Sequence, residues 1–331
     1  MANTPTFINI GPGRCATTWL FEVFRAHPEI SMSSVKETEY FNTLYHKGDA
    51  WYEAHFPESA GGDHAAIGEI SNNYYLDPEV ATRIQKYCPG MKLIINVRDP
   101  FALMQSFHGF GLRRGQELED LGQSLGEPIG RLMGSGYDVR ARKNQLTTGD
   151  QFTLLESVML ADRIKPFLES FDESQVYVFV YERLKTEKPK VLAEIYEFLG
   201  VDAEFVPPVS ENVINASIEP KSKWIARLIP SVTYRLRQMG LNGLLSRLHR
   251  SELIKQILFR KTADRKVDRV DPRSVVGEEA SRALNDQIAW LKSNVSTIGT
   301  AWDHLDTSTA SLSTELPASQ TASVLEGETG A

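Results

Sequence analysis

The sequence predicts an α/β fold in which a central, mainly parallel sheet is flanked by helices. Three short apolar runs have the composition of buried strands, and segments with apolar residues at helical spacing lie between them. Strands that alternate with helices favour parallel pairing, because a crossover helix returns the chain to the same end of the sheet. The 331 residues, 41% hydrophobic and 24% charged, suffice for one large globular domain or two small ones.

The first predicted strand is Thr6 to Ile10, a β-prone run that stops at the glycine turn Gly11-Pro12-Gly13. Thr17 to Ala26 then has apolar residues at helical spacing, which predicts a strand, a tight loop and a helix in that order. The second strand, Lys92 to Val97, ends before Pro100, where a helix is expected to begin. The other predicted elements are a third strand at Gln175 to Tyr181 and helices at Pro78 to Tyr87, Leu155 to Phe171 and Pro189 to Leu199.

We expect a single domain over residues 1–306. Beyond His304 the chain is rich in Ser, Thr, Ala, Gly and Glu and has neither Lys nor Arg. Such a segment cannot bury enough apolar surface to offset the entropy of ordering it. Residues 307–331 are therefore predicted to form a disordered tail.

Positive charge is concentrated between residues 221 and 266. This stretch has twelve Lys or Arg residues against Glu252 and Asp264, a net charge of +10, whereas the whole chain carries −7. The overall charge gives no reason to expect nucleic acid as a partner. Apolar residues recur at helical spacing here, which predicts an amphipathic helical region. Two interpretations stay open: helices that pack their apolar faces on the core, or an interfacial helix that attaches the protein to an anionic membrane surface.

The chain contains two cysteines, Cys15 and Cys88, too few for a disulfide framework. We expect two free thiols and a reducing compartment. No segment before Gly11 has the pattern of a signal peptide, and no window is apolar enough to span a membrane. The expected location is cytoplasmic, or peripheral on the inner membrane surface if residues 221–266 bind lipid.

The loop between the first strand and the first helix has the features of an anion site. A strand that passes through a glycine turn into a helix presents backbone N–H groups and the positive end of the helix dipole. Arg14 adds a charged donor, and the hydroxyl groups of Thr17 and Thr18 can add hydrogen bonds. A nucleotide-hydrolase P-loop would have glycine at Ala16 and lysine at Thr17. The loop alone fits an anion site and a simple helix start equally well.

Further motifs accompany this loop along the chain. Their order over residues 6 to 305 resembles the sulfotransferases that use 3'-phosphoadenosine 5'-phosphosulfate (PAPS), most nearly the carbohydrate-type and bacterial branches. The resemblance implies a P-loop-like sulfotransferase fold and transfer of a sulfuryl group from PAPS to an acceptor hydroxyl or amine, with adenosine 3',5'-bisphosphate as product and no metal required. The motifs are Gly11-x-x-Arg14-Cys15-Ala16-Thr17-Thr18-x-Leu20, His27-Pro28-x-Ile30, Lys36-Glu37-x-x-Tyr40-Phe41, Gly68-Glu69, Arg98-Asp99-Pro100 with Ser106, Tyr181-Glu182-x-Leu184 and Phe198-Leu199-Gly200.

The resemblance assigns nucleotide contacts by position. Arg14 replaces the usual lysine, so its role is electrostatic rather than proton donation. Ala16 stands where the family usually has glycine. An alanine is acceptable there if its φ is negative and unfavourable if its φ is positive. The residues implied to grip the 5'-phosphosulfate are Arg14, Cys15, Ala16, Thr17 and Thr18; Arg98 and Ser106 are implied to bind the 3'-phosphate, and Ser217, before Lys221, belongs to the candidate adenine loop.

The resemblance also indicates a general base, which must take a proton from the acceptor. Glu37 stands where carbohydrate-type members place their catalytic glutamate. Lys36 either contacts the donor or is solvated. His108 is a rival base, because the branch acting on phenols and steroids uses a histidine, although at another position. Glu69 is expected to be structural and paired with a basic group.

The acceptor is expected to be a small molecule, a lipid or a carbohydrate. Members that sulfate glycosaminoglycans tend to have a lysine after Gly-Glu, where this chain has Ile70 and then Ser71, which argues against a highly anionic sugar chain. Two alternatives come from other classes: a P-loop nucleotide-dependent kinase, which would need a Walker lysine and an acid for Mg²⁺, and a non-catalytic membrane-binding adaptor that uses residues 221–266.

Overall fold

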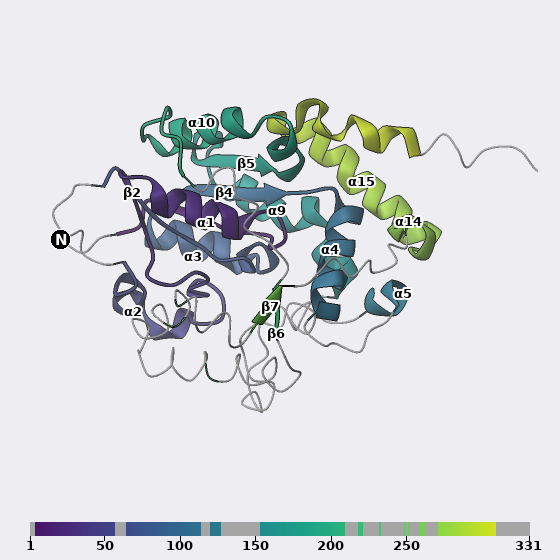
Figure 1. Cartoon of the computed structure of the whole chain (residues 1–331), viewed down its shortest axis with the longest axis horizontal. Coiled ribbons are helices and arrows are strands. Elements are labelled where there is room, and N and C mark those ends of the chain that lie inside the picture. The colour runs from purple at the N-terminus through teal and green to yellow at the C-terminus, as the bar shows by residue number, and fades with distance from the viewer. Residues whose placement is uncertain are drawn as a thin grey trace, which may run out of the picture.

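The protein contains one five-stranded parallel sheet with the strand order β2-β3-β1-β4-β5 (Figure 1). The computed structural model describes residues 4–56, 64–113, 120–126, 153–208, 218–220, 232, 248, 251, 259–261 and 271–308. The sheet confirms the predicted α/β class and the parallel pairing. Its strands are β1 (Phe7–Asn9), β2 (Ile30–Met32), β3 (Ala66–Ile70), β4 (Lys92–Val97) and β5 (Val176–Val180).

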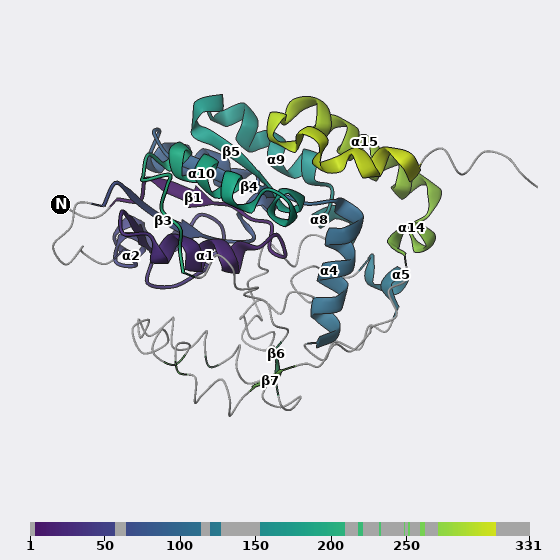
Figure 2. The same ribbon diagram turned by 45° about the horizontal axis from the view of Figure 1, so that its top comes forward.

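Helices cover both faces of the sheet, because alternate residues of each strand point to opposite sides. In β4, Leu93 and Ile95 enter one apolar core and Ile94 enters the other. The core of Ile94 is closed by α1 (Thr17–Ala26) and α10 (Lys188–Leu199). The helices of the other core are α3 (Glu79–Tyr87), α4 (Pro100–Arg113), α9 (Leu160–Ser170) and α15 (Glu278–Asn294). Figure 1 labels all four, and Figure 2 shows α4, α9 and α15 from a second direction.

A thirteen-residue C-terminal segment, η5 (Ser296–Ser308), is interrupted at Gly299 and Trp302 and covers the open edge of β5. The Thr297 hydroxyl donates to the Val178 carbonyl at 2.7 Å, and the Trp302 indole donates to Glu182 at 2.9 Å. The remaining described elements are η1 (Tyr45–Lys47), α2 (Asp49–Glu53), η2 (Tyr74–Leu76), α5 (Leu121–Ser124), α8 (Leu154–Ser157), η3 (Glu173–Gln175), η4 (Tyr181–Lys185), α14 (Pro272–Val275) and the antiparallel pair β6 (Ile218–Pro220) and β7 (Phe259–Lys261).

The structure differs from the sequence-based expectation at four places. β2 and β3 were not predicted, because β2 has three residues and β3 contains Gly68 and Glu69, which interrupt its apolar pattern. The helix predicted at 155–171 is two helices, α8 and α9. Thr153 caps α8 through a capping box, and the chain breaks at Val158 and Met159 before α9 begins. The long helix α15 was not predicted either.

Several predictions fall on the undescribed part of the chain. Most of the stretch 221–266 and residues 309–331 lie outside the described residues, so the amphipathic region and the disordered tail stay predictions, as does the single domain over 1–306. Among the helices that the structure describes, none combines the length and apolarity needed to cross a membrane.

The contact between β1 and β3 gives a first testable prediction. An ideal Cβ on Gly68 would lie 2.4 Å from the ring of Phe7, its neighbour across the two strands. That ring is fully buried and packs edge-on against Phe24 at a centroid distance of 5.5 Å, so it has little room to move. Gly68→Ala should lower the free energy of unfolding by about 1–3 kcal/mol through overpacking, measured by urea denaturation.

Gly90 provides the matched control. An added Cβ there meets no atom within 4 Å. Gly90→Ala should change the free energy of unfolding by less than about 0.5 kcal/mol. Equal stability of the two variants would contradict the close packing of Phe7 on Gly68.

Candidate active site

The loop after β1 is held by two buried asparagines. Asn9 in β1 and Asn96 in β4 are both fully buried, and the Asn9 amide donates to the Asn96 amide oxygen at 2.7 Å. Asn9 also accepts from the backbone N–H of Gly11 at 3.0 Å, and Asn96 donates to the carbonyl of Cys15 at 2.9 Å. The pair therefore fixes both ends of the loop to the sheet. Neither residue was singled out from the sequence; an amide inside an apolar strand was the available signal.

Gly11 lies against the segment that follows β3. Its φ is 90°, and an ideal Cβ there would lie 2.2 Å from the backbone oxygen of Asn72. Both the backbone angle and the close approach require glycine. The loop after β1 and the turn after β3 are consequently in direct contact.

The loop enters α1 through residues with left-handed backbone angles. Arg14 has φ 64°, and Ala16, the N-cap of α1, has φ 62° and ψ 18°. Ala16 thus has the positive φ that is unfavourable for a residue with a Cβ. Ala16 has no side-chain group that could cap α1, and the first N–H groups of the helix point toward the loop with the positive end of the helix dipole. Thr17 is buried in the first turn and Thr18 is exposed there.

Arg14, Ser106 and Arg98 meet at this loop, although they come from different segments. Arg14 Nε donates to Ser106 Oγ at 3.2 Å, and its guanidinium lies 4.8 Å from the centre of the Phe110 ring. Ser106 and Phe110 are one turn apart on α4 and share a face. Arg98 Nη1 donates to the carbonyl of Arg14 at 2.8 Å. Sequence reasoning selected all three residues, and the structure brings them together.

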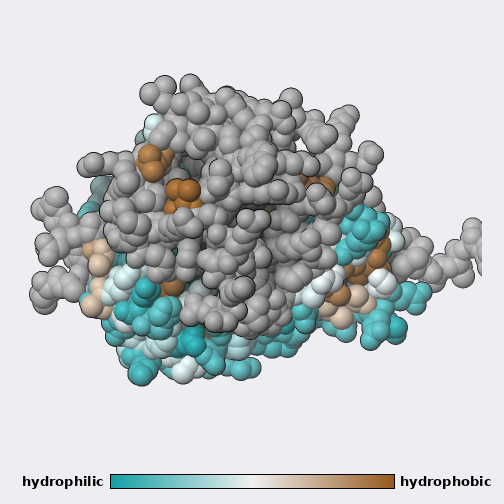
Figure 3. All heavy atoms as spheres, turned by 90° about the horizontal axis from the view of Figure 1, so that it is seen from below, coloured by the Kyte–Doolittle hydropathy of each residue, from teal (hydrophilic) through white to brown (hydrophobic). Residues whose placement is uncertain are grey.

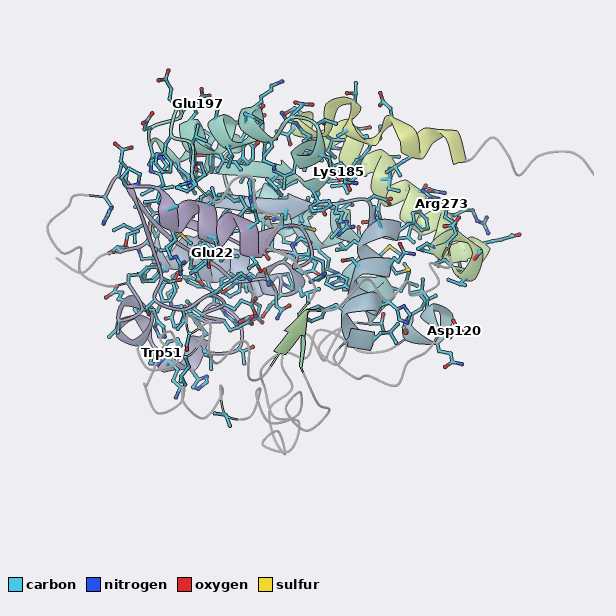
Figure 4. The ribbon with its side chains drawn as sticks, viewed as in Figure 1. Glu22, Trp51, Asp120, Lys185, Glu197 and Arg273 are labelled. Carbon is cyan, nitrogen blue, oxygen red and sulfur yellow. The ribbon has the colours of Figure 1, made fainter. Side chains whose placement is uncertain are left out.

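Arg98 retains hydrogen-bonding capacity toward an anion. Its guanidinium stacks on Tyr181 at 4.3 Å, and its buried Nε has no hydrogen-bond partner among the described residues. A cavity of about 440 Å³ adjoins Arg98 at the ends of β4 and β5, and Lys185, labelled in Figure 4, also lines it. Two carboxylates in its wall are already engaged: Asp99 caps α4, and Glu182 accepts from Trp302.

A larger cavity of about 700 Å³ lies between α10 and η5 and contains none of the predicted site residues. Its charged lining is largely paired internally. Arg183 donates to Glu194 at 2.7 Å and to Glu187 at 3.1 Å, and these bonds lower the pKa of both carboxyl groups. The larger cavity therefore gives no reason to move the candidate site away from Arg98.

Glu37 lies close to the place where the loop after β1 touches the turn after β3. Lys36 Nζ donates to Glu37 Oε1 at 2.8 Å, and Asn72 Nδ2 donates to the same oxygen at 2.6 Å. The backbone of Asn72 is in contact with Gly11. Asn72 therefore connects Glu37 to the loop after β1. Lys36 was expected to contact the donor or to be solvated; the structure shows it in an ion pair with Glu37.

Glu69 was expected to pair with a basic group, but its described partners are hydroxyl groups. Thr38 and Ser71 donate to Oε2, and Tyr52 and Tyr74 donate to Oε1. The carboxyl group is fully buried, and this burial raises its pKa even though the four hydrogen bonds act in the opposite direction.

The three other candidates are His108, Cys15 and Ser217. His108 follows Ser106 by two residues on α4, which turns it about 200° around the helix axis; this favours Glu37 as the base. The thiol of Cys15 is buried, and this burial raises its pKa. Cys15 and Cys88 are both free cysteines. Cys15 therefore serves the loop through its backbone. Ser217 lies outside the described residues.

Comparison with known proteins gives a consistent result. The family model "Sulfotransferase domain" matches residues 4–224. The membrane-associated sulfotransferase kil1 of Dictyostelium discoideum is 34% identical over 110 residues, which is 33% of this chain and 23% of that protein. The heparan sulfate glucosamine 3-O-sulfotransferase 3B1 of Mus musculus is 26% identical over 197 residues, 60% of this chain and 46% of that protein. The matches thus span between about a quarter and a half of the length of these relatives.

A solved structure shows the same fold. The crystal structure of a sulfotransferase from Alicyclobacillus acidocaldarius superimposes with a TM-score of 0.51 at 20% identity, over 77% of this chain and 95% of that one. At this identity the similarity concerns the fold alone.

The backbone of Ala16 gives a second testable prediction. A left-handed conformation costs a residue with a Cβ roughly 1–2 kcal/mol, whereas glycine adopts it without strain. The greater freedom of glycine in the unfolded chain offsets about 0.4–1 kcal/mol of the gain. Ala16→Gly should raise the free energy of unfolding by up to about 1.6 kcal/mol, measured by thermal and urea denaturation.

Ala193, inside α10, is the control of opposite sign. Ala193→Gly should lower the free energy of unfolding by about 1 kcal/mol. A loss of similar size for Ala16→Gly would show that Ala16 does not have a positive φ.

Proposed function

The chain belongs to the sulfotransferase domain family, and from this we propose that it transfers a sulfuryl group from PAPS to a hydroxyl or amine group of an acceptor. The observation that best supports the proposal is the meeting of Arg14, Arg98 and Ser106 at the loop after β1. Two guanidinium groups, a hydroxyl and a helix N-terminus suit a ligand with two anionic ends.

In this proposal the two arginines have different tasks. Arg98 binds the 3'-phosphate, for which its buried Nε and the hydroxyl of Ser106 are available donors. Arg14 lies at the loop that holds the 5'-phosphosulfate and neutralises the charge that develops on the departing phosphate. A guanidinium does not give up its proton in proteins, so Arg14 acts by charge and hydrogen bonding alone.

Glu37 is the proposed general base. A lone pair of the acceptor attacks the sulfur atom in line, the bond from sulfur to the bridging oxygen breaks, and adenosine 3',5'-bisphosphate leaves. The acceptor proton passes to the Glu37 carboxylate. Lys36 and Asn72 both donate to Oε1, which fixes the orientation of that carboxylate next to the loop. The mechanism uses no covalent enzyme intermediate, and we propose that it uses no metal.

For the acceptor we propose a neutral carbohydrate or glycolipid group. Matched relatives include proteins named for sulfation of heparan sulfate, which supports a sugar. Ile70 and Ser71 carry no positive charge, and both side chains are fully buried. These two positions therefore offer no cation to a strongly anionic chain. A panel of sugars, lipids, phenols and amines incubated with labelled PAPS, with mass detection of the product, identifies the acceptor.

Variants of Glu37 and Arg98 should affect different quantities, turnover and nucleotide affinity respectively. Glu37→Gln should lower turnover about a hundredfold or more, the usual scale for a general base, with the affinity for adenosine 3',5'-bisphosphate nearly unchanged. Turnover is measured with labelled PAPS and nucleotide affinity by calorimetry. Full turnover in this variant would remove Glu37 from the mechanism.

Arg98→Ala should chiefly weaken nucleotide affinity, because it removes a charged donor from the 3'-phosphate site. Binding of adenosine 5'-phosphosulfate, which lacks that phosphate, should change much less. Intact affinity for the bisphosphate together with lower turnover would refute the 3'-phosphate role.

We further propose a cytoplasmic protein that attaches peripherally to anionic membranes through residues 221–266. The net charge of +10 over this stretch supports attachment, and so does the similarity to kil1, which is named as a membrane-associated sulfotransferase. In the view of Figure 3 the described residues include hydrophilic areas and separate hydrophobic groups, and the large hydrophobic residues with high exposure are Val206 and Val232 among those described.

Salt dependence tests this attachment. The protein should sediment with vesicles of 30% phosphatidylserine at low ionic strength and be released as salt rises, because exposed charges are screened beyond about 10 Å at 0.1 M salt. Vesicles of phosphatidylcholine alone are the control. Equal sedimentation with both would contradict an electrostatic attachment.

A further inference from the structure

The segment that carries Glu37 has an unfavourable backbone course. Glu37 has φ 64° and Glu39 has φ 54°, and both angles belong to the left-handed region that favours glycine. Residues with side chains stay in this region only where the surrounding structure holds them there. The contacts of this segment therefore show what sets the position of Glu37.

Backbone N–H groups of the segment bind to groups from the end of β3 and the turn after it. Glu37 N donates to the carbonyl of Ile70 at 2.8 Å. Glu39 N donates to Ser71 Oγ at 3.3 Å, and Phe41 N donates to the Tyr74 hydroxyl at 3.2 Å. The segment is thus attached at every second residue to one short stretch of chain.

Glu69 lies at the centre of these attachments. Its Oε2 accepts from Thr38 Oγ1 at 2.5 Å and from Ser71 Oγ at 2.8 Å, and its Oε1 accepts from the Tyr74 hydroxyl at 3.0 Å. The Tyr52 hydroxyl, from α2, donates to Oε1 at 2.9 Å. Thr38 directly follows Glu37, so one hydrogen bond separates the buried carboxyl group from the residue next to the proposed base.

The direction of these hydrogen bonds matters as much as their number. A hydroxyl group has one proton to donate and two lone pairs that accept. Because Ser71 and Tyr74 donate their protons to Glu69, their lone pairs face the N–H groups of Glu39 and Phe41. If the group at position 69 donated protons, these hydroxyl groups would have to accept from it. Their own protons would then point toward the backbone N–H groups of Glu39 and Phe41, and those hydrogen bonds would be lost.

We propose that Glu69 is a positioning residue for the transfer reaction, which holds the Glu37 carboxylate in place through the hydroxyl groups of Thr38, Ser71 and Tyr74. The inference rests on the proposed role of Glu37 as general base. It differs from a purely structural role because Glu69 faces the one segment that bears the base, and its four described partners include Thr38 of that segment. Desolvation raises the pKa of Glu69, in keeping with a carboxyl group buried without a cation among its described partners.

Thr38→Val, Thr38→Ser and Glu69→Gln test the inference. Valine keeps the volume of Thr38 and removes the hydroxyl, serine keeps the hydroxyl, and glutamine replaces one acceptor atom by a donor. Thr38→Val and Glu69→Gln should lower kcat ten- to a hundredfold, the scale for a misplacement of about 1 Å at a reacting centre. Affinity for adenosine 3',5'-bisphosphate should stay within about twofold, and Thr38→Ser should recover most of kcat.

Thr43→Val is the matched control. Thr43 belongs to the same stretch of chain, but its buried Oγ1 has no partner among the described residues. This variant should keep kcat, nucleotide affinity and melting temperature. A loss of kcat in Thr43→Val equal to that in Thr38→Val would reduce the effect to general packing and overturn the proposal.

A spectroscopic measurement tests the same point without an acceptor. In protein labelled with ¹³C at the glutamate carboxyl groups, Glu37→Gln identifies the Glu37 resonance. Thr38→Val and Glu69→Gln should move this resonance, because the bonds from Lys36 and Asn72 to Oε1 depend on the position of the segment. Thr43→Val should leave it in place. An unmoved resonance in both test variants would overturn the proposal.

The two proposals fail in different ways. Active Glu37→Gln would refute the general base itself. Inactive Glu37→Gln combined with full kcat in folded Thr38→Val and Glu69→Gln would leave the base in place and refute only the positioning role of Glu69.

Discussion

The site depends on the buried amide pair of Asn9 and Asn96. These side chains lie on neighbouring parallel strands, where a polar group without a partner would be costly. By bonding to each other and to the backbone of Gly11 and Cys15, they satisfy their own polar atoms and fix both ends of the loop after β1. The geometry of Arg14, and through its carbonyl that of Arg98, follows from where this loop is held.

The parallel sheet explains why one small region receives contributions from distant segments. In a parallel sheet all strands end on the same side, and ligands bind beyond those ends. The loop with Arg14 follows β1, β3 carries Glu69 and is followed by Asn72, and Arg98 follows β4. Because β1 lies between β3 and β4, its loop is in contact with both neighbours, at Asn72 on one side and Arg98 on the other.

The sequence predicted the parts of this fold that have a clear local signal. β1, β4 and β5 are apolar runs, and Thr17 to Ala26 has a strong helical pattern, so these elements were confirmed. β3 was missed because Gly68 and Glu69 serve a close contact with Phe7 and a hydrogen-bond cluster, and both residues disrupt the apolar pattern. Arg14 and Ser106 could be paired only through the family resemblance, since 92 residues separate them. The partners of Glu37 and Glu69 were not predictable, because an asparagine or a tyrosine carries no local sign of the carboxylate it will meet.

Backbone strain marks the same region and explains the limit of prediction. The residues other than glycine with positive φ, among those the structure describes, are Arg14, Ala16, Glu37 and Glu39, and all four lie in the two segments that build the site. At each position a glycine would relieve strain, but at Arg14 and Glu37 it would also remove the charged side chain that the proposed chemistry requires. The protein therefore keeps side chains where the backbone disfavours them. The hydrogen bonds that Asn9, Glu69 and Ser71 accept, and the one that Asn96 donates, supply the stabilisation that these backbone angles need. The strained backbone and the buried polar network thus form one arrangement, because the strain would not persist without the network.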